Sequence, residues 1–242
     1  MKLLVSPISL DEAVSIIDAG ADIIDIKNVN EGSLGAQFPW KITEIVRFVE
    51  KHGISTSATL GDLPFKPGTA SQAAYGVALC GVNYIKVGLY GLNTYDQAVE
   101  MMTAVQRAVR MVSDTLQVVA SGYADYKRFD GLNPSDLVKA AKTVGCDGVM
   151  VDTAFKDGPN LFDALTLNEI RDFVALAREA NMFVALAGSI KASHAEKLLE
   201  IGPDIIGVRG ALCGGPDRHS KISVQKTKDF IRMFRREPVE QV

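Results

Sequence analysis

Short apolar segments alternate with longer amphipathic segments along the whole chain. The short segments are rich in branched side chains, as at Val118 and Val119 or Ile205 and Ile206. Near-continuous apolar character of this kind is typical of parallel strands that helices cover on their outer face. The pattern predicts strands over residues 2–5, 22–27, 54–59, 83–87, 116–121, 147–152, 183–187 and 204–208.

The amphipathic segments predict one helix after each strand. Helix-capping residues mark several of the beginnings: Ser9, Asn133 before a proline, and Thr166 with Glu169 three residues later as a capping box. The predicted helices cover residues 9–19, 39–52, 69–80, 94–111, 134–144, 166–180, 191–200 and 222–234.

Eight strand–helix units in a chain of 242 residues indicate an α/β protein, and most specifically a (β/α)8 TIM barrel. A doubly wound open sheet is the alternative, but units of nearly even length favour closure. No linker or change of composition divides the chain, so residues 1–242 are expected to form a single catalytic domain.

Charged side chains occur at or just beyond the ends of three predicted strands. Asp25 and Lys27 are two residues apart, so strand alternation places them on one face. Lys86 lies near the end of a second strand, and Asp152 with Lys156 lies at the end of a third. The active site of a TIM barrel lies at the carboxyl ends of its strands. These five residues are therefore the candidate catalytic groups.

A single buried Lys–Asp pair is more often structural than catalytic. Three lysines and two aspartates in register favour chemistry, because a structural core does not need so many unlike charges. The longest predicted loops, residues 28–39, 61–68 and 122–132, also lie at the carboxyl ends of predicted strands, where binding loops are expected.

Lysine supports two kinds of chemistry in such a site. A neutral amine attacks a carbonyl to form a Schiff base, and an ammonium or amine moves protons. A pKa near ~8 leaves about one-tenth of a lysine neutral at pH 7, compared with an ordinary pKa of ~10.4. Burial and neighbouring ammonium groups lower the pKa, whereas Asp25 and Asp152 raise it. The sequence alone does not determine whether these opposing effects lower the pKa of a candidate lysine overall.

Two glycine-containing turns after the last two predicted strands indicate a phosphate site. They cover residues 187–191 and 207–211, and turns at these two positions commonly bind phosphate in TIM barrels. The alternative is that the glycines only form turns. The groups expected to hold the phosphate are the backbone N–H groups of Gly188, Ser189, Gly210 and Ala211, with Arg209 as a charge partner.

Composition narrows the classes of partner. The net charge is −3 and the basic residues are dispersed, which gives no general attraction to nucleic acid. No apolar run approaches the roughly 18 residues that a membrane span needs. Barrels of this size often self-associate, so we expect a homo-oligomer. Apolar segments on the predicted outer helices, such as Met101–Met102 and residues 173–177, face either a partner or only the barrel.

Metal and cofactor signatures are missing from the sequence. The three cysteines, Cys80, Cys146 and Cys213, are dispersed without CxxC spacing, as expected of buried thiols in a reducing cytoplasm. The histidines are not at metal-ligand spacing, and neither GxxxxGK[ST] nor GxGxxG occurs. We therefore expect no metal and no organic cofactor.

Eight segments of the chain match the pattern of one known family. They are residues 25–28, 31–36, 38–40, 84–91, 122–125, 152–158, 187–191 and 207–211. Together they resemble the (5-formylfuran-3-yl)methyl phosphate synthase family. The resemblance covers essentially the whole chain, and its lysine segments are specific. One departure is Val29, where the family pattern has a proline after the asparagine; this difference changes the stiffness of the loop rather than the chemistry.

The resemblance implies a TIM barrel that condenses two glyceraldehyde 3-phosphate molecules. The implied product is 4-(hydroxymethyl)-2-furancarboxaldehyde phosphate, a furan precursor of methanofuran-type coenzymes, formed with loss of phosphate and water by a carbon–oxygen lyase. It further implies that Lys27 is the Schiff-base lysine and Lys86 the proton-transfer residue. Asp25, Asp152 and Lys156 would support them, without a cofactor.

Two alternatives remain at this point. The first is a Schiff-base aldolase that acts on other sugar phosphates. The second is a non-catalytic sensor of phosphorylated metabolites, which would keep the phosphate turns and lose the strand-end lysines. Lys27, Lys86 and Lys156 are all present, so the sensor is the weaker alternative.

Overall fold

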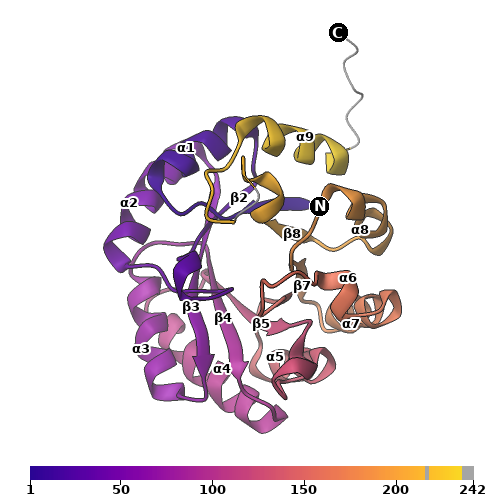
Figure 1. Cartoon of the computed structure of the whole chain (residues 1–242). Coiled ribbons are helices and arrows are strands. Elements are labelled where there is room, and N and C mark those ends of the chain that lie inside the picture. Colours follow the sequence, from indigo (N-terminus) through magenta and orange to yellow (C-terminus); the bar gives the residue numbers. More distant parts are fainter. Residues whose placement is uncertain (216–217, 236–242) are drawn as a thin grey trace.

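The strands form a closed parallel barrel in which each strand pairs with the next and the last pairs with the first (Figure 1). The computed structural model describes residues 1–215 and 218–235. The predicted (β/α)8 TIM barrel is confirmed. The strands are β1 (Lys2–Val5), β2 (Ile23–Ile26), β3 (Ser55–Pro64), β4 (Tyr84–Gly91), β5 (Gln117–Tyr123), β6 (Gly148–Asp152), β7 (Phe183–Leu186) and β8 (Ile205–Val208).

Helices surround the barrel and cover its outer surface (Figure 1). The principal helices are α1 (Leu10–Ala19), α2 (Pro39–Val49), α3 (Pro67–Ala78), α4 (Tyr95–Arg110), α5 (Pro134–Val144), α7 (Leu167–Glu179), α8 (Ala195–Ile201) and α9 (Val224–Arg235). A short helix, α6 (Leu161–Ala164), was not predicted. It begins at Asn160 with a capping box to Asp163 and is too short to show apolar periodicity.

Three strands extend beyond their predicted ends, so part of the expected loops at residues 61–68 and 122–132 is strand. The β3–β4 ladder continues to Asp62↔Gly88 and Pro64↔Gly91 through register shifts. A Cβ atom at Gly88 would lie 2.8 Å from the carbonyl oxygen of Gly61. The extension therefore depends on close backbone approach at glycine, which an apolar pattern does not reveal.

The barrel interior divides into an apolar and a polar part. The apolar side chains cluster as Leu4, Ile23, Val119, Met150, Ala185, Ala187 and Ile205. Buried polar side chains continue the same strand faces toward the carboxyl ends, among them Ser6, Asp25, Lys27, Ser57, Lys86 and Asp152. Burying several charged groups is costly unless they pair or act in chemistry.

The outer strand faces and the inner helix faces form the main core. Met101, Met102, Phe173 and Val174 are buried there, so they pack against the barrel and offer no surface for self-association. Cys80, Cys146 and Cys213 are also buried. Across residues 1–215 and 218–235, no helix has the length and apolar character needed to cross a membrane.

Candidate active site

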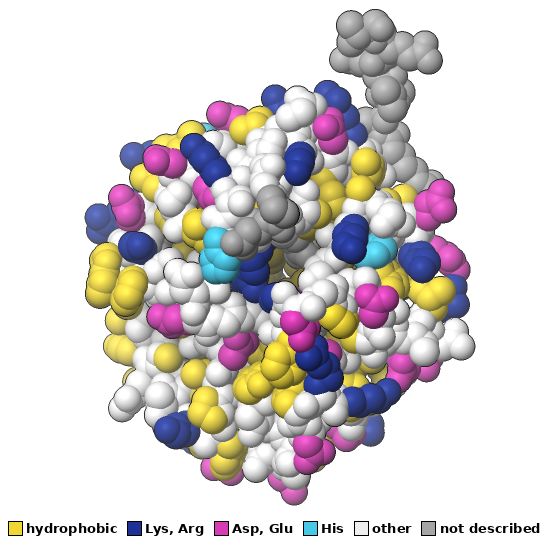
Figure 2. Space-filling model, in the orientation of Figure 1, with side chains coloured by type: hydrophobic (Ala, Val, Ile, Leu, Met, Phe, Trp, Pro, Cys, Tyr) yellow, Lys and Arg dark blue, Asp and Glu magenta, His cyan; other side chains and the backbone are white. Residues whose placement is uncertain are grey.

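A cavity of about 390 Å³ opens at the carboxyl ends of the strands. In Figure 2 this face is hollowed near its centre, and lysine and arginine side chains lie beside the hollow. Nine of the ten residues predicted for the site line the cavity: Asp25, Lys27, Asp152, Lys156, Gly188, Ser189, Arg209, Gly210 and Ala211. The tenth, Lys86, contacts Asp25 from within the barrel and is 2% exposed.

Asp25 connects the cavity to Lys86. The Nζ atom of Lys86 lies 2.7 Å from Oδ1 of Asp25. Ser57 donates a hydrogen bond to the same oxygen at 2.6 Å, and Ser6 donates one to Oδ2 at 2.9 Å. Burial favours the neutral acid, but the charges of Lys86 and Lys27 and the Ser57 hydroxyl outweigh it and lower the pKa of Asp25. Asp25 is therefore an anion at neutral pH.

Lys27 is the only one of the three lysines that makes no carboxylate ion pair within residues 1–215 and 218–235. Its Nζ donates a hydrogen bond to the carbonyl oxygen of Ser33, at 3.1 Å, in the loop after β2. Burial lowers its pKa to about 8, Lys86 and Lys156 act in the same direction, and Asp152 and Asp25 oppose them.

This pKa of about 8 leaves about one-tenth of Lys27 neutral at pH 7. That neutral fraction is roughly 200-fold larger than for a lysine with an ordinary pKa of ~10.4. Lys27 is therefore a buried cavity-lining lysine with an unusually large neutral fraction at pH 7.

Asp152 and Lys156 form a second pair on the β6 side of the cavity. The Nζ atom of Lys156 lies 2.6 Å from Oδ1 of Asp152 and 2.9 Å from Oγ1 of Thr153. Burial by itself raises the pKa of Asp152, but Lys156 and Lys27 outweigh it and lower the pKa to about 2. This pair places a carboxylate and a lysine amine together at the cavity wall.

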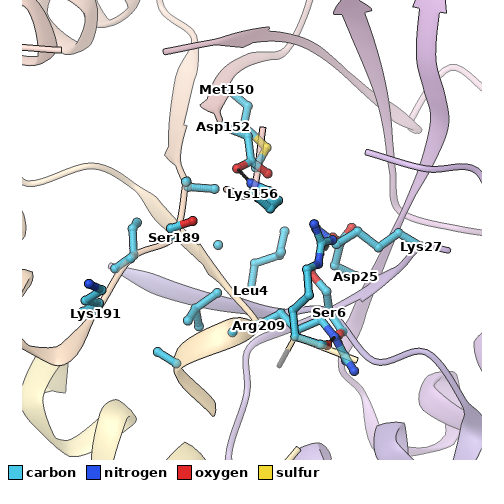
Figure 3. Close-up of a pocket in the computed structure, with 18 residues that line it drawn as sticks. Leu4, Ser6, Asp25, Lys27, Met150, Asp152, Lys156, Ser189, Lys191 and Arg209 are labelled. Atoms are coloured by element: carbon cyan, nitrogen blue, oxygen red, sulfur yellow. Dashed lines mark hydrogen bonds and ion pairs between the residues drawn. The ribbon is translucent and has the colours of Figure 1, made fainter. Parts of the chain in front are cut away.

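Figure 3 shows how these groups surround the cavity. Asp25 and Lys27 lie on one side, and Ser189 and Lys191 lie on the opposite side, while the Asp152–Lys156 pair lies between them. A carbonyl compound bound in the cavity would thus contact a reactive amine while two Lys–Asp pairs flank it.

The predicted phosphate turns present free backbone donors to the cavity. Gly188 and Ser189 both have positive φ, at 112° and 49°. A Cβ atom at position 188 would lie 3.0 Å from Cγ2 of Thr153, so this close turn favours glycine. In the described part of the chain, no acceptor is bonded to the N–H groups of Gly188, Ser189, Gly210 and Ala211. Clustered free amides of this kind form anion sites.

Arg209 has a different environment from the one expected of a phosphate partner. Nη1 and Nη2 bond to the buried carboxylate of Glu12 at 2.9 and 3.3 Å. The remaining donors bond to the carbonyl oxygens of Arg218, Ser6 and Ser220 at 2.7, 2.6 and 3.3 Å. All five guanidinium donors are occupied. Arg209 therefore supports the cavity wall, and its place as a direct phosphate ligand is not favoured.

Three parts of the site were not predicted from the sequence. Ser6 and Ser57 hold Asp25 from strands on either side of β2. Arg218 lines the cavity from the segment between β8 and α9. Tyr123 donates a hydrogen bond to Asp62 at the extended rim, where burial and that carboxylate raise its pKa well above its ordinary value. Strand alternation could have identified Ser57, two residues from a core position, but nothing in the sequence marks Arg218.

Among the residues described, no three metal-ligating side chains come together as a metal site. Solved structures with the same fold include a copper homeostasis protein CutC from Streptococcus agalactiae, with a TM-score of 0.66 and 14% identity over 86% of this chain and 98% of that one. Thiamine phosphate pyrophosphorylase from Pyrococcus furiosus has a TM-score of 0.62 and 14% identity over 97% and 96%. These similarities extend to the fold alone.

Curated relatives are much more similar. A protein named (5-formylfuran-3-yl)methyl phosphate synthase from Archaeoglobus fulgidus is 54% identical over 92% of this chain and 94% of its own length. Proteins of the same name from Methanocaldococcus jannaschii and Methanothermobacter thermautotrophicus are 52% and 47% identical, over 91% and 97% of this chain and 93% and 100% of theirs. The family profile described as 4-HFC-P synthase matches residues 3–231. With the barrel and its lysine-lined cavity, this match shows that the chain belongs to the 4-HFC-P synthase family.

Proposed function

We propose that residues 1–242 form one catalytic domain that condenses two glyceraldehyde 3-phosphate molecules to 4-(hydroxymethyl)-2-furancarboxaldehyde phosphate, in the biosynthesis of a methanofuran-type coenzyme. The observation that carries the proposal is Lys27, a buried amine with a pKa of about 8 at the wall of the cavity. Among the described residues it has no carboxylate partner, and the backbone amides of the two glycine turns that line the cavity have no acceptor. The names of the relatives supply the product.

The proposed reaction begins with isomerisation of one triose phosphate to its ketone form. The neutral amine of Lys27 attacks that carbonyl, and loss of water gives an iminium whose carbon is an electrophile. A base removes the α-proton of the second triose phosphate, which expels its phosphate, and the terminal carbon of the resulting enol forms the carbon–carbon bond with the iminium carbon. Lys86 and Lys156 both act on the charge of Lys27, each lies beside a carboxylate, and they are the candidate groups for these proton transfers.

Closure of the ring by the hydroxymethyl oxygen, loss of water and elimination of the amine of Lys27 complete the proposed sequence and free the lysine. Two triose phosphates equal one furan phosphate, one inorganic phosphate and two waters, so no oxidant or reductant is required. Each elimination needs one proton removed from carbon and one delivered to the leaving group. Asp25 and Asp152 are anions at the start of the reaction, because their lowered pKa values keep them charged at neutral pH, and they stabilise the cationic forms of the lysines.

The backbone amides of Gly188, Ser189, Gly210 and Ala211 are proposed to hold a substrate phosphate. We also propose that the protein acts in the cytoplasm and self-associates, with no nucleic-acid or membrane partner. A light-scattering mass near 26.1 kDa at all working concentrations would contradict self-association.

Product analysis separates this function from a Schiff-base aldolase of other sugar phosphates. Purified protein is incubated with glyceraldehyde 3-phosphate, and the products are resolved by chromatography and mass spectrometry. A furan phosphate together with inorganic phosphate supports the condensation. If the product is a simple ketose phosphate, the protein is a Schiff-base aldolase instead. If the substrate binds tightly without turnover, the result supports a sensor.

The rate of imine trapping should depend on pH in a way that reports the pKa of Lys27. The neutral amine increases from about one-tenth at pH 7 to about nine-tenths at pH 9, because the pKa is about 8. Trapping by cyanoborohydride with a triose phosphate should therefore accelerate about tenfold over this range. The adduct on Lys27 is followed by intact-protein mass spectrometry. A midpoint near the ordinary lysine pKa would contradict this assignment.

A further inference from the structure

The two proposed substrate molecules together carry two phosphoryl groups, and the backbone amides described above are proposed to hold one of them. A second phosphoryl group needs its own cation or donors if the cavity is to hold both molecules at once. Arg209 cannot serve, since its five donors are occupied by Glu12 and three carbonyl oxygens.

Arg218 is a half-buried guanidinium at the wall of the same cavity. Its side chain has no hydrogen bond or ion pair with any residue in the described ranges 1–215 and 218–235. Burial lowers its pKa and Arg209 acts in the same direction, while Asp152 and Asp62 oppose them. An arginine remains protonated in spite of such shifts. Without a partner among the described residues, the guanidinium is a partly desolvated positive charge that an anion would satisfy.

Arg218 lines the same cavity as Lys27 and Asp152. Asp152 belongs to β6 and Asp62 to the extended end of β3, and both carboxylates favour the charged form of the guanidinium. A ligand that fills this cavity beside Lys27 is therefore within reach of Arg218.

Hydrogen bonds from the side chain of Arg209 and to the side chain of Glu12 hold the main chain of residues 218–222. Nε of Arg209 donates to the carbonyl oxygen of Arg218 at 2.7 Å, and Nη2 donates to that of Ser220 at 3.3 Å. The N–H group of Ile222 donates to Glu12 at 3.1 Å. The segment that carries Arg218 is thereby fixed to β8 and α1, so the guanidinium is presented from an anchored backbone.

We propose that Arg218 is a substrate-binding residue that takes a phosphoryl group distinct from the one held by the backbone amides. The chemistry that it recognises is a phosphate monoester dianion, for which the planar fork of arginine is suited. That this phosphate belongs to the second triose phosphate rests on the proposed function. The anion site itself does not.

The test compares Arg218→Gln and Arg218→Lys with the wild-type protein, and uses Arg232→Gln as a matched control on α9. Arg232 is exposed and lies 3.6 Å from Asp229, away from the cavity lining. Inorganic phosphate binding is measured by calorimetry, and the KM and kcat of furan phosphate formation are measured separately. Far-UV circular dichroism and the unfolding midpoint check that each variant is folded.

We expect Arg218→Gln to weaken one phosphate-binding event by at least about tenfold, since a charge-assisted hydrogen bond is lost. KM for glyceraldehyde 3-phosphate should rise by a similar factor, Arg218→Lys should recover part of the loss, and Arg232→Gln should change neither. Trapping of dihydroxyacetone phosphate on Lys27 should stay near the wild-type rate, because that molecule has one phosphate. A purely structural role would not give this separation.

The outcomes remain distinct if the proposed function is wrong. If the wild-type protein makes no furan phosphate, the proposed condensation is wrong. The phosphate titration would still decide whether Arg218 binds an anion. Unchanged phosphate binding in a folded Arg218→Gln variant would overturn the proposal, and so would an equal loss of trapping and of turnover.

Discussion

We expect Lys27→Arg to lose both imine trapping and turnover. Guanidinium stays protonated and offers no neutral amine, so the nucleophile is removed while the positive charge is kept. Loss of a covalent nucleophile should lower turnover by at least roughly 10³-fold. The measurement is product formation from glyceraldehyde 3-phosphate, together with peptide mapping of the cyanoborohydride adduct in the wild-type protein.

The fold should survive this change. Lys27 lies at the cavity wall, and among the described residues its side chain donates a hydrogen bond to one carbonyl oxygen, that of Ser33. Lys191→Arg is a suitable control, because Lys191 also lines the cavity but is exposed. It should keep trapping at Lys27. Near-normal turnover by Lys27→Arg, or an adduct that maps to Lys86 or Lys156, would show that another lysine is the nucleophile.

Replacing Lys86 by arginine should separate imine formation from the later proton transfers. Lys86 is 2% exposed and contacts Asp25 rather than the cavity, so it is placed to exchange protons through that carboxylate and not to attack a carbonyl. Arginine preserves the charge beside Asp25 but cannot release a proton. Turnover should fall by about 10²–10⁴-fold, the usual range for general acid–base catalysis, while trapping continues.

Single-turnover experiments can measure the two steps in one sample, with the adduct followed by mass spectrometry and the furan by absorbance.

The Lys86→Arg variant is a better test than a change at Asp25, because Asp25→Asn would leave Lys86 as a buried charge without its anion. Breaking a buried pair in that way typically costs about 3–5 kcal/mol of stability. If trapping and turnover fell together in a folded Lys86→Arg variant, Lys86 would have a role in imine formation itself.

The barrel could be predicted because its repeating signal is local. Each strand is a short apolar run that precedes an amphipathic helix, and strand-end positions follow from alternation. Asp25 and Lys27 were therefore placed together by their two-residue spacing alone. The taller rim formed by β3 and β4 could not be predicted, since it depends on close approach of glycine backbones at Gly61 and Gly88.

The finer parts of the site depend on partners that are distant in sequence. Ser57 reaches Asp25 only because β2 and β3 pair in one register, with Asp25 opposite Ser57. Arg209 follows β8, as a phosphate partner would, but its environment is set by Glu12 near the other end of the chain. The sequence indicated which residue types gather at the barrel mouth, whereas the closed barrel determines which donors remain available.

The contact between Glu12 and Arg209 spans 197 residues of sequence and has a consequence for biosynthesis of the enzyme. A ribosome releases the chain from its N-terminus, so all five candidate groups, from Asp25 to Lys156, emerge before Arg209 does. Until then Glu12 lacks its partner and the cavity has no β8 wall. We expect a C-terminally truncated chain that ends before β8 to carry every reacting group and yet to form no furan. Incomplete or damaged chains would thus be inert toward reactive sugar aldehydes.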